Sequence, residues 1–155
     1  MKSCVIDIRP YEDSARQCQK DLRGKGRTYL CEYKETSPVG VQFNDKTGIV
    51  GVNRNEICDA THRLVNEGKM LELPAECPEI KQFARECATL AKIEIIDKKT
   101  KATTFRYRKL SAETPDDYRH ALNYFYLAAS GHRVGVVDGQ RRRRSKHAKN
   151  DYVRC

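Results

Sequence analysis

Residues 4–33 read CVIDIRPYEDSARQCQKDLRGKGRTYLCEY, a strand pattern, a helix pattern and a second strand pattern in succession. The opening run CVIDI is short and mostly apolar, as in a strand buried in the middle of a sheet, and Pro10 ends it. Residues 12–22 have helical spacing, with acids near the start and Gly24 just past the end. Residues 28–33 return to a β-branched and aromatic pattern. A βαβ unit implies parallel neighbouring strands and a right-handed crossover, so the sequence predicts an α/β fold.

The rest of the chain continues with strands and helices in alternation. We expect strands at residues 39–43, 49–52, 69–73, 92–97 and 103–109, the last two as an antiparallel hairpin at a sheet edge. We expect helices from a cap at Asn53 or Asn55 to about residue 66, from Pro78 to about residue 91, and from a cap at 114–117 to near Gly131.

Composition and charge indicate one folded domain. The chain has 155 residues, 39% of them hydrophobic, and a formal net charge of +9, which is enough apolar material for one core. No stretch approaches the roughly 20 apolar residues that span a bilayer, and the start has no signal-peptide pattern, so we expect a cytoplasmic protein without membrane contact. Seven cysteines at irregular spacings, without a CxxC pair, are expected to be reduced and mostly buried.

Most of the positive charge lies at the end of the chain. Residues 139–155, GQRRRRSKHAKNDYVRC, hold seven Lys or Arg and one acid, a net +6, so residues 1–138 carry +3. A like-charged run with few apolar groups predicts a disordered tail after a folded domain of residues 1–138. Such a tail either keeps the chain in solution or binds nucleic-acid phosphates without regard to sequence. The residues predicted to make the phosphate contacts are Arg141, Arg142, Arg143, Arg144 and Lys146.

Two groups of polar residues interrupt otherwise apolar elements. Asp7 lies in the first strand, where a carboxylate needs a cation or hydrogen-bond donors. In the last helix Asp116, His120 and Asn123 follow one another at i, i+4 and i+7, with Asp117 alongside, so they share one face. The structural alternative is that Asp7 is a surface residue, the helix acids complement the helix dipole and the histidine is a hydrogen-bonded interior residue.

A strand aspartate combined with two acids on a late helix is also a known way to build a site for hard cations. Two Mg²⁺ or Mn²⁺ ions about 4 Å apart need carboxylate oxygens from several elements, and together they activate water and stabilise the leaving oxygen of a phosphodiester. A neighbouring histidine can transfer a proton or contact the phosphate. We therefore take Asp7, Asp116 and Asp117 as candidate metal ligands, and these three with His120 as candidate catalytic residues.

The order of three segments resembles a known nuclease family. CVIDIRPYEDSARQCQKDLRGKG, VGVNRNEICDATHRLVNEGKMLELP and TPDDYRHALNYFYLAA, which together span residues 4–129, resemble the C-terminal nuclease domain of the large subunit of tailed-phage terminases. The VNRNE…GKMLELP block and the DDxxHALxY helix are the most specific parts. The resemblance implies an RNase H-like mixed sheet flanked by helices, and metal-dependent endonuclease cleavage of double-stranded viral DNA during packaging in the bacterial host.

The resemblance also assigns roles and partners. Asp7 matches the second metal-binding acid of such nucleases and Asp116 the third, with Asp117 adjacent and His120 one turn along. The strand with the first acid, and the ATPase motor, would precede residue 1, so the metal site would be incomplete and strand 4–8 would have an unpaired edge. Implied partners are double-stranded DNA, an N-terminal terminase fragment, the small terminase subunit and the portal. Two alternatives stay open: a non-catalytic DNA-binding or packaging-assembly piece, and another RNase H-like nuclease such as a resolvase or transposase fragment.

Overall fold

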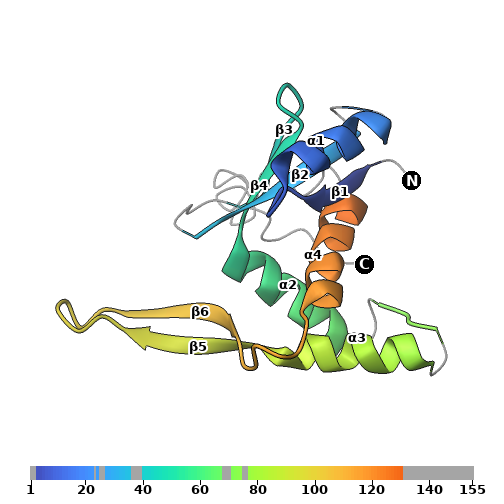
Figure 1. The fold of residues 1–155 in the computed structure, drawn as a ribbon. Coiled ribbons are helices and arrows are strands. Elements are labelled where there is room, and N and C mark those ends of the chain that lie inside the picture. The colour runs from blue at the N-terminus through green and yellow to red at the C-terminus, as the bar shows by residue number, and fades with distance from the viewer. Residues whose placement is uncertain are drawn as a thin grey trace, which may run out of the picture.

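A computed structural model describes residues 3–22, 24, 27–35, 40–67, 71–74 and 77–130 (Figure 1). The elements along the chain are β1 (Cys4–Asp7), α1 (Glu12–Asp21), β2 (Thr28–Lys34), β3 (Gln42–Asn44), β4 (Ile49–Asn53), α2 (Arg54–Asn66), α3 (Pro78–Thr89), β5 (Leu90–Ile96), β6 (Thr103–Lys109) and α4 (Asp117–Ser130). The predicted α/β class is confirmed; an RNase H-like arrangement stays a prediction. The predicted tail, with Arg141, Arg142, Arg143, Arg144 and Lys146, lies outside the described residues.

The larger sheet has the strand order β1-β2-β4-β3, with β1, β2 and β4 parallel and β3 antiparallel to β4. The parallel β1–α1–β2 unit is therefore as expected. The apolar run CVIDI predicted a strand in the middle of the sheet. This prediction is wrong for the described strands, because β1 forms the edge of the sheet. An unpaired edge at this strand is what the resemblance implies.

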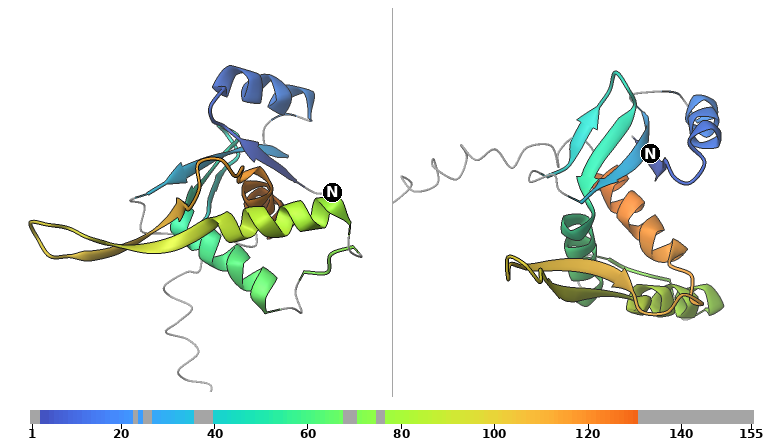
Figure 2. Two further views of the ribbon diagram at one scale, coloured as in Figure 1. Left: turned by 60° about the horizontal axis from the view of Figure 1, so that its bottom comes forward. Right: turned by 60° about the vertical axis from the view of Figure 1, so that its left-hand side comes forward.

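Helices lie on both faces of this sheet (Figure 2). Val5, Tyr29 and Cys31 point to one face, where Leu127 of α4 joins them in the core. On the other face α1 is fixed by buried Gln19, whose Nε2 donates to the carbonyls of Thr28 and Gly48 at 2.7 and 2.8 Å. Successive side chains of a strand alternate between faces, so the same strands supply both layers of packing.

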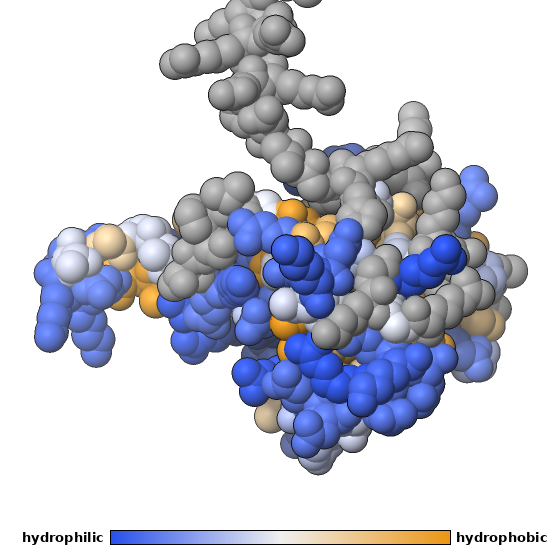
Figure 3. Space-filling model, turned by 90° about the horizontal axis from the view of Figure 1, so that it is seen from above, coloured by the Kyte–Doolittle hydropathy of each residue, from blue (hydrophilic) through white to orange (hydrophobic). Residues whose placement is uncertain are grey.

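The hairpin β5–β6 does not extend the larger sheet. It forms a two-stranded sheet of its own and projects from the body, as Figures 1 and 2 show, so its predicted place at a sheet edge is wrong. In Figure 3 it is a separate lobe with a mainly hydrophilic tip. We call the hairpin, residues 90–109, the arm.

The strand predicted at residues 69–73 is wrong for residues 71–73, which have no regular structure. Residues 69 and 70 lie outside the described part of the chain.

Hydrogen bonds fix where two of the helices begin. Of the two predicted caps for α2 it is Asn53 that accepts, at 2.9 and 3.2 Å, from the backbone N–H groups of Asn55 and Glu56. The start of α4 is held by Glu86 of α3, a buried carboxylate whose Oε2 accepts from the N–H of Tyr118 at 2.7 Å. A negative group at a helix N-terminus is favourable both as an acceptor and towards the helix dipole.

A buried polar network joins α2, α4 and β2. The Arg119 guanidinium, only 1% exposed, donates to Thr61 Oγ1 at 2.7 Å, Asn123 Oδ1 at 3.0 Å and the Cys58 carbonyl at 2.9 Å. Asn123 in turn donates from Nδ2 to the Tyr33 hydroxyl at 3.0 Å. A buried charge without such donors and acceptors would be costly, so this network requires the three elements to pack in one arrangement.

The cysteines were expected to be reduced and mostly buried. Of the six described cysteines, all free, Cys31 and Cys58 are buried, three are partly buried and Cys18 is exposed. The prediction that they are mostly buried is thus confirmed only in part. Within the described ranges, no helix is both long and apolar enough to cross a membrane.

Removing the amide at the centre of the network tests its contribution to stability. We expect Asn123→Ala to lower the free energy of unfolding by about 2 kcal/mol. The buried guanidinium of Arg119 loses one of its acceptors, and the Tyr33 hydroxyl loses the donor that now binds it. Gln17→Ala, which removes an exposed amide on α1, should change it by less than about 0.5 kcal/mol. Urea denaturation measures both; equal effects of the two substitutions would contradict this account.

Candidate functional site

The candidate site lies where the three parallel strands end. Asp7 closes β1, Tyr33 is near the end of β2, and Arg54 follows β4 directly as the first residue of α2. His120 of α4 faces the same place, and these four residues line one pocket of about 250 Å³. The carboxyl ends of parallel strands are where α/β proteins commonly bind ligands, because loops and helix starts converge there. We call this the strand-end pocket.

The carboxylate of Asp7 is held from two directions. Its Oδ2 accepts from the Tyr124 hydroxyl at 2.6 Å, and its Oδ1 accepts from the backbone N–H of Arg9 at 2.9 Å. Tyr124 belongs to α4, so this bond ties the end of β1 to the helix that carries the other candidate residues. Burial, the neighbouring Tyr33 and the hydrogen bond to Asp7 raise the pKa of Tyr124, which therefore remains a donor at neutral pH.

Asp116 and His120 form a pair on α4, as their i, i+4 spacing predicts. His120 Nε2 lies 3.3 Å from Asp116 Oδ2, and Nδ1 lies 3.0 Å from the Tyr33 hydroxyl. The Tyr33 hydroxyl already accepts from Asn123, so we assign its own proton to His120 Nδ1 and the imidazole proton to Nε2. Asp116 Oδ1 also lies 3.4 Å from Lys109 Nζ.

The histidine is neutral at pH 7 in this arrangement. Burial lowers the pKa of His120, and the Asp116 carboxylate opposes that shift without reversing it. Because both ring nitrogens have partners, the imidazole orients Asp116 and Tyr33. This is a positioning role, and a substrate would have to displace one of these contacts before the ring could transfer a proton.

Two arginines, Arg9 and Arg54, line the pocket together with the acids Asp7 and Glu32. Of these two arginines, it is Arg54 that lies near Tyr33. Its guanidinium carbon lies 6.0 Å from the centre of the Tyr33 ring, within range of a cation–π contact. Its Nε is buried and, among the described residues, has no hydrogen-bond partner. A buried donor without a partner costs about 1–3 kcal/mol, so Arg54 would gain from an oxygen-rich ligand placed beside it.

A divalent cation is the group that the terminase resemblance implies. Carboxylate oxygens are its preferred ligands, and each oxygen of Asp7 uses one hydrogen bond in the structure and keeps further acceptor capacity. In the described part of the chain, however, no three His, Cys, Asp or Glu residues lie together as a metal site. The chemistry of Asp7 therefore fits one ligand of such an ion, and the two-metal site stays a prediction.

The predicted site residues differ in placement. Asp7 and His120 share the strand-end pocket and Asp116 adjoins it through His120, whereas Asp117 is exposed in the first turn of α4. Sequence reasoning missed Tyr33, Tyr124 and Arg54. Tyr124 had a signal, because it extends the stripe of Asp116 and His120 by one more helical turn. Arg54 had one too, directly after a helix cap at a strand end, and Tyr33 had none.

Comparison with known proteins adds no assignment. A scan of protein-family models and searches of curated proteins and of solved structures give no match to this chain.

The state of His120 predicts how stability depends on pH. The folded state binds the imidazole proton less readily than the unfolded state, whose pKa is near 6.5. The free energy of unfolding should therefore fall as the pH drops through about 6.5 towards the folded pKa, because the unfolded chain gains a proton first. His120→Gln should remove this loss, as measured by urea denaturation at about pH 7.5 and pH 5.5.

The exposed His62 provides the control. His62→Gln should keep the wild-type difference between the two pH values. If His62→Gln removes the difference while His120→Gln keeps it, the buried neutral imidazole is ruled out.

Proposed function

We propose that this protein is the nuclease module of a DNA-packaging terminase and that it acts on phosphodiesters of double-stranded DNA at the strand-end pocket. One observation carries this proposal: Asp7 and the Asp116–His120 pair come from ends of the chain more than a hundred residues apart and meet beside Arg54. Acids, an oriented histidine and an arginine without a full set of partners are the groups that phosphodiester hydrolysis uses. The terminase-like motifs supply the substrate class.

Each residue has a defined task in this mechanism. Arg54 binds a phosphate oxygen, and the arginine side chain suits this because its donors match a phosphate in a fixed fork geometry. Tyr124 fixes the rotamer of Asp7, and His120 fixes that of Asp116, so neither carboxylate must be ordered when DNA binds. A divalent ion held by Asp7, with Asp116 contributing, would activate water and stabilise the leaving oxygen.

Plasmid cleavage tests this function. With Mn²⁺ or Mg²⁺ present, we expect the full chain to nick or linearise supercoiled DNA, and Asp7→Asn and Asp116→Asn to lower the rate by more than about 100-fold. Asp13→Asn, which changes an exposed acid on α1, is the matched control and should leave the rate unchanged. Cleavage that survives both site substitutions would refute the assignment of the site.

A second candidate function is DNA binding without cleavage, as in a packaging-assembly piece. Two observations favour it: Asp116 lies against Lys109 at 3.4 Å, and the described residues assemble no three-ligand metal site. This candidate requires that the full chain bind duplex DNA and leave it intact with either metal. Asp7→Asn would then leave the affinity for DNA unchanged or raise it slightly, because one negative charge near the phosphates is lost.

The tail is tested by deletion. Removing residues 140–155 takes away seven Lys or Arg and one acid. We expect weaker duplex binding and a flatter dependence of affinity on salt, because fewer counterions are released from the DNA. Unchanged affinity and salt dependence, measured by fluorescence anisotropy, would remove the tail from the DNA-binding surface.

A further inference from the structure

The arm carries dense positive charge away from the body. Residues 90–109 contain seven Lys or Arg and two acids, a formal charge of +5. Figure 1 and the left view of Figure 2 show the arm extending well beyond α2 and α3. At about 3.3 Å per residue, a seven-residue strand is roughly 23 Å long, which spans about seven phosphates of one DNA strand along the helix axis.

Acids pair with two of the cations near the base of the arm, whereas Arg108, which is opposite Ala91 at the base, and the lysines of the turn have no ion pair within the described residues. Lys92 pairs with Asp59 at 2.8 Å, and Arg106 pairs with Glu35 at 2.8 Å. Ion pairs between described residues involve neither Arg108 nor the three lysines of the turn, Lys98, Lys99 and Lys101. The carboxylate of Asp97, at the turn, accepts from the backbone N–H groups of Lys99 and Thr100 at 2.8 Å. The side chains of the turn lysines therefore extend without an acidic partner.

The base of the arm is fixed to α2. Asn55 binds the outer edge of β6 as a neighbouring strand would: its Nδ2 donates to the Phe105 carbonyl at 2.8 Å and its Oδ1 accepts from the Tyr107 N–H at 3.1 Å. The Tyr107 hydroxyl donates to Asp59 at 2.8 Å. Burial acts to raise the pKa of Asp59, but the hydrogen bonds from Lys92 and Tyr107 outweigh it and lower this pKa. Asp59 thus stays ionised and the arm keeps a set direction.

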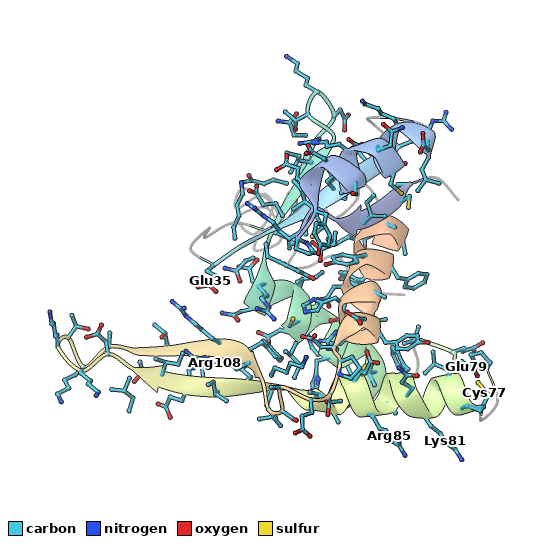
Figure 4. The ribbon with its side chains drawn as sticks, in the orientation of Figure 1. Glu35, Cys77, Glu79, Lys81, Arg85 and Arg108 are labelled. Atoms are coloured by element: carbon cyan, nitrogen blue, oxygen red, sulfur yellow. The ribbon has the colours of Figure 1, made fainter. Side chains whose placement is uncertain are left out.

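A second pocket, of about 160 Å³, lies between the base of the arm and the end of β2. Arg54, Arg106 and Arg108 line it, with Glu35 as the one acid among its lining residues. Figure 4 shows Glu35 at the end of β2, above the arm, and Arg108 on the arm below. Arg54 also lines the strand-end pocket, so it connects the two pockets. Its buried Nε, without a partner among the described residues, lies at this junction.

We propose that the arm and Arg54 form a track for the phosphate backbone of duplex DNA that leads into the strand-end pocket. The turn lysines bind phosphates at the outer end of the arm, Arg108 binds one at its base, and Arg54 binds the phosphate nearest Asp7 and His120. A two-stranded ribbon of this kind is narrow enough to lie in or along a major groove. The inference rests on the proposed function for the identity of the ligand and adds the path that this ligand takes.

Salt-dependent binding to a short duplex tests the track in the full chain. Each lost phosphate contact should lower the slope of log affinity against log salt by about 1. We therefore expect Arg108→Gln to weaken binding several-fold and lower the slope by about 1, and the triple change Lys98→Gln, Lys99→Gln and Lys101→Gln to lower it by up to about 3. Arg85→Gln is the matched control, because Arg85 is exposed on α3 and points away from the body in Figure 4.

The possible outcomes separate the two proposals. If the full chain binds duplex DNA and the arm substitutions change neither affinity nor slope, the track is refuted and the proposed function stands. If the full chain binds no duplex DNA at low salt, the proposed function and the track both fail. If an RNA duplex of the same sequence binds more tightly and depends on the same arm residues, the arm is an RNA-binding element and the assignment to DNA is overturned. An equal effect from Arg85→Gln would also overturn it, since general charge would then explain the binding.

Discussion

The buried guanidinium of Arg119 is the constraint on which the candidate site depends. A charge inside a protein is costly unless it is hydrogen-bonded, and this guanidinium donates to two side chains and one carbonyl from α2 and α4. Asn123 extends the network to the Tyr33 hydroxyl, and Tyr33 in turn binds His120. The position of the imidazole is therefore set by an interaction in the core. The side chains of the pocket are therefore positioned by the same packing that stabilises the whole domain.

The start of α4 is likewise fixed by a buried polar side chain. Glu86 reaches from α3 to the N–H of Tyr118, so a buried carboxylate fixes the turn in which Asp116 lies. One end of the helix is thus held by α3. Arg119 is held by Thr61 and Cys58 of α2, and the Tyr124 hydroxyl by Asp7 at the end of β1. Three separate attachments along α4 leave little freedom in how its polar stripe meets the sheet. Preorganisation of this kind reduces the ordering that a bound substrate would otherwise require.

Local patterns predicted most elements but few of the contacts between them. The βαβ unit, the cap at Asn53 and the stripe of Asp116 and His120 follow from residues near one another in sequence, and the structure contains them. The arm was predicted as a hairpin at the wrong place, because which edge a strand pairs with depends on residues far away, such as Asn55. Tyr33 could not be found, since an aromatic residue in a strand is normally part of the core and its hydroxyl partners come from α4.

The placement of charge explains how a pocket that contains carboxylates could still receive a polyanion. The carboxylates of Asp7 and Asp116 repel phosphates at short range, and the nearby cations Arg9, Arg54 and Lys109 offset this repulsion locally. At physiological ionic strength the Debye length is about 8 Å, shorter than the roughly 23 Å of the arm. Attraction by the outer lysines therefore acts on DNA that has not yet come within range of the acids. Binding along the arm raises the local concentration of phosphates beside Arg54, so capture and positioning are carried out by different residues.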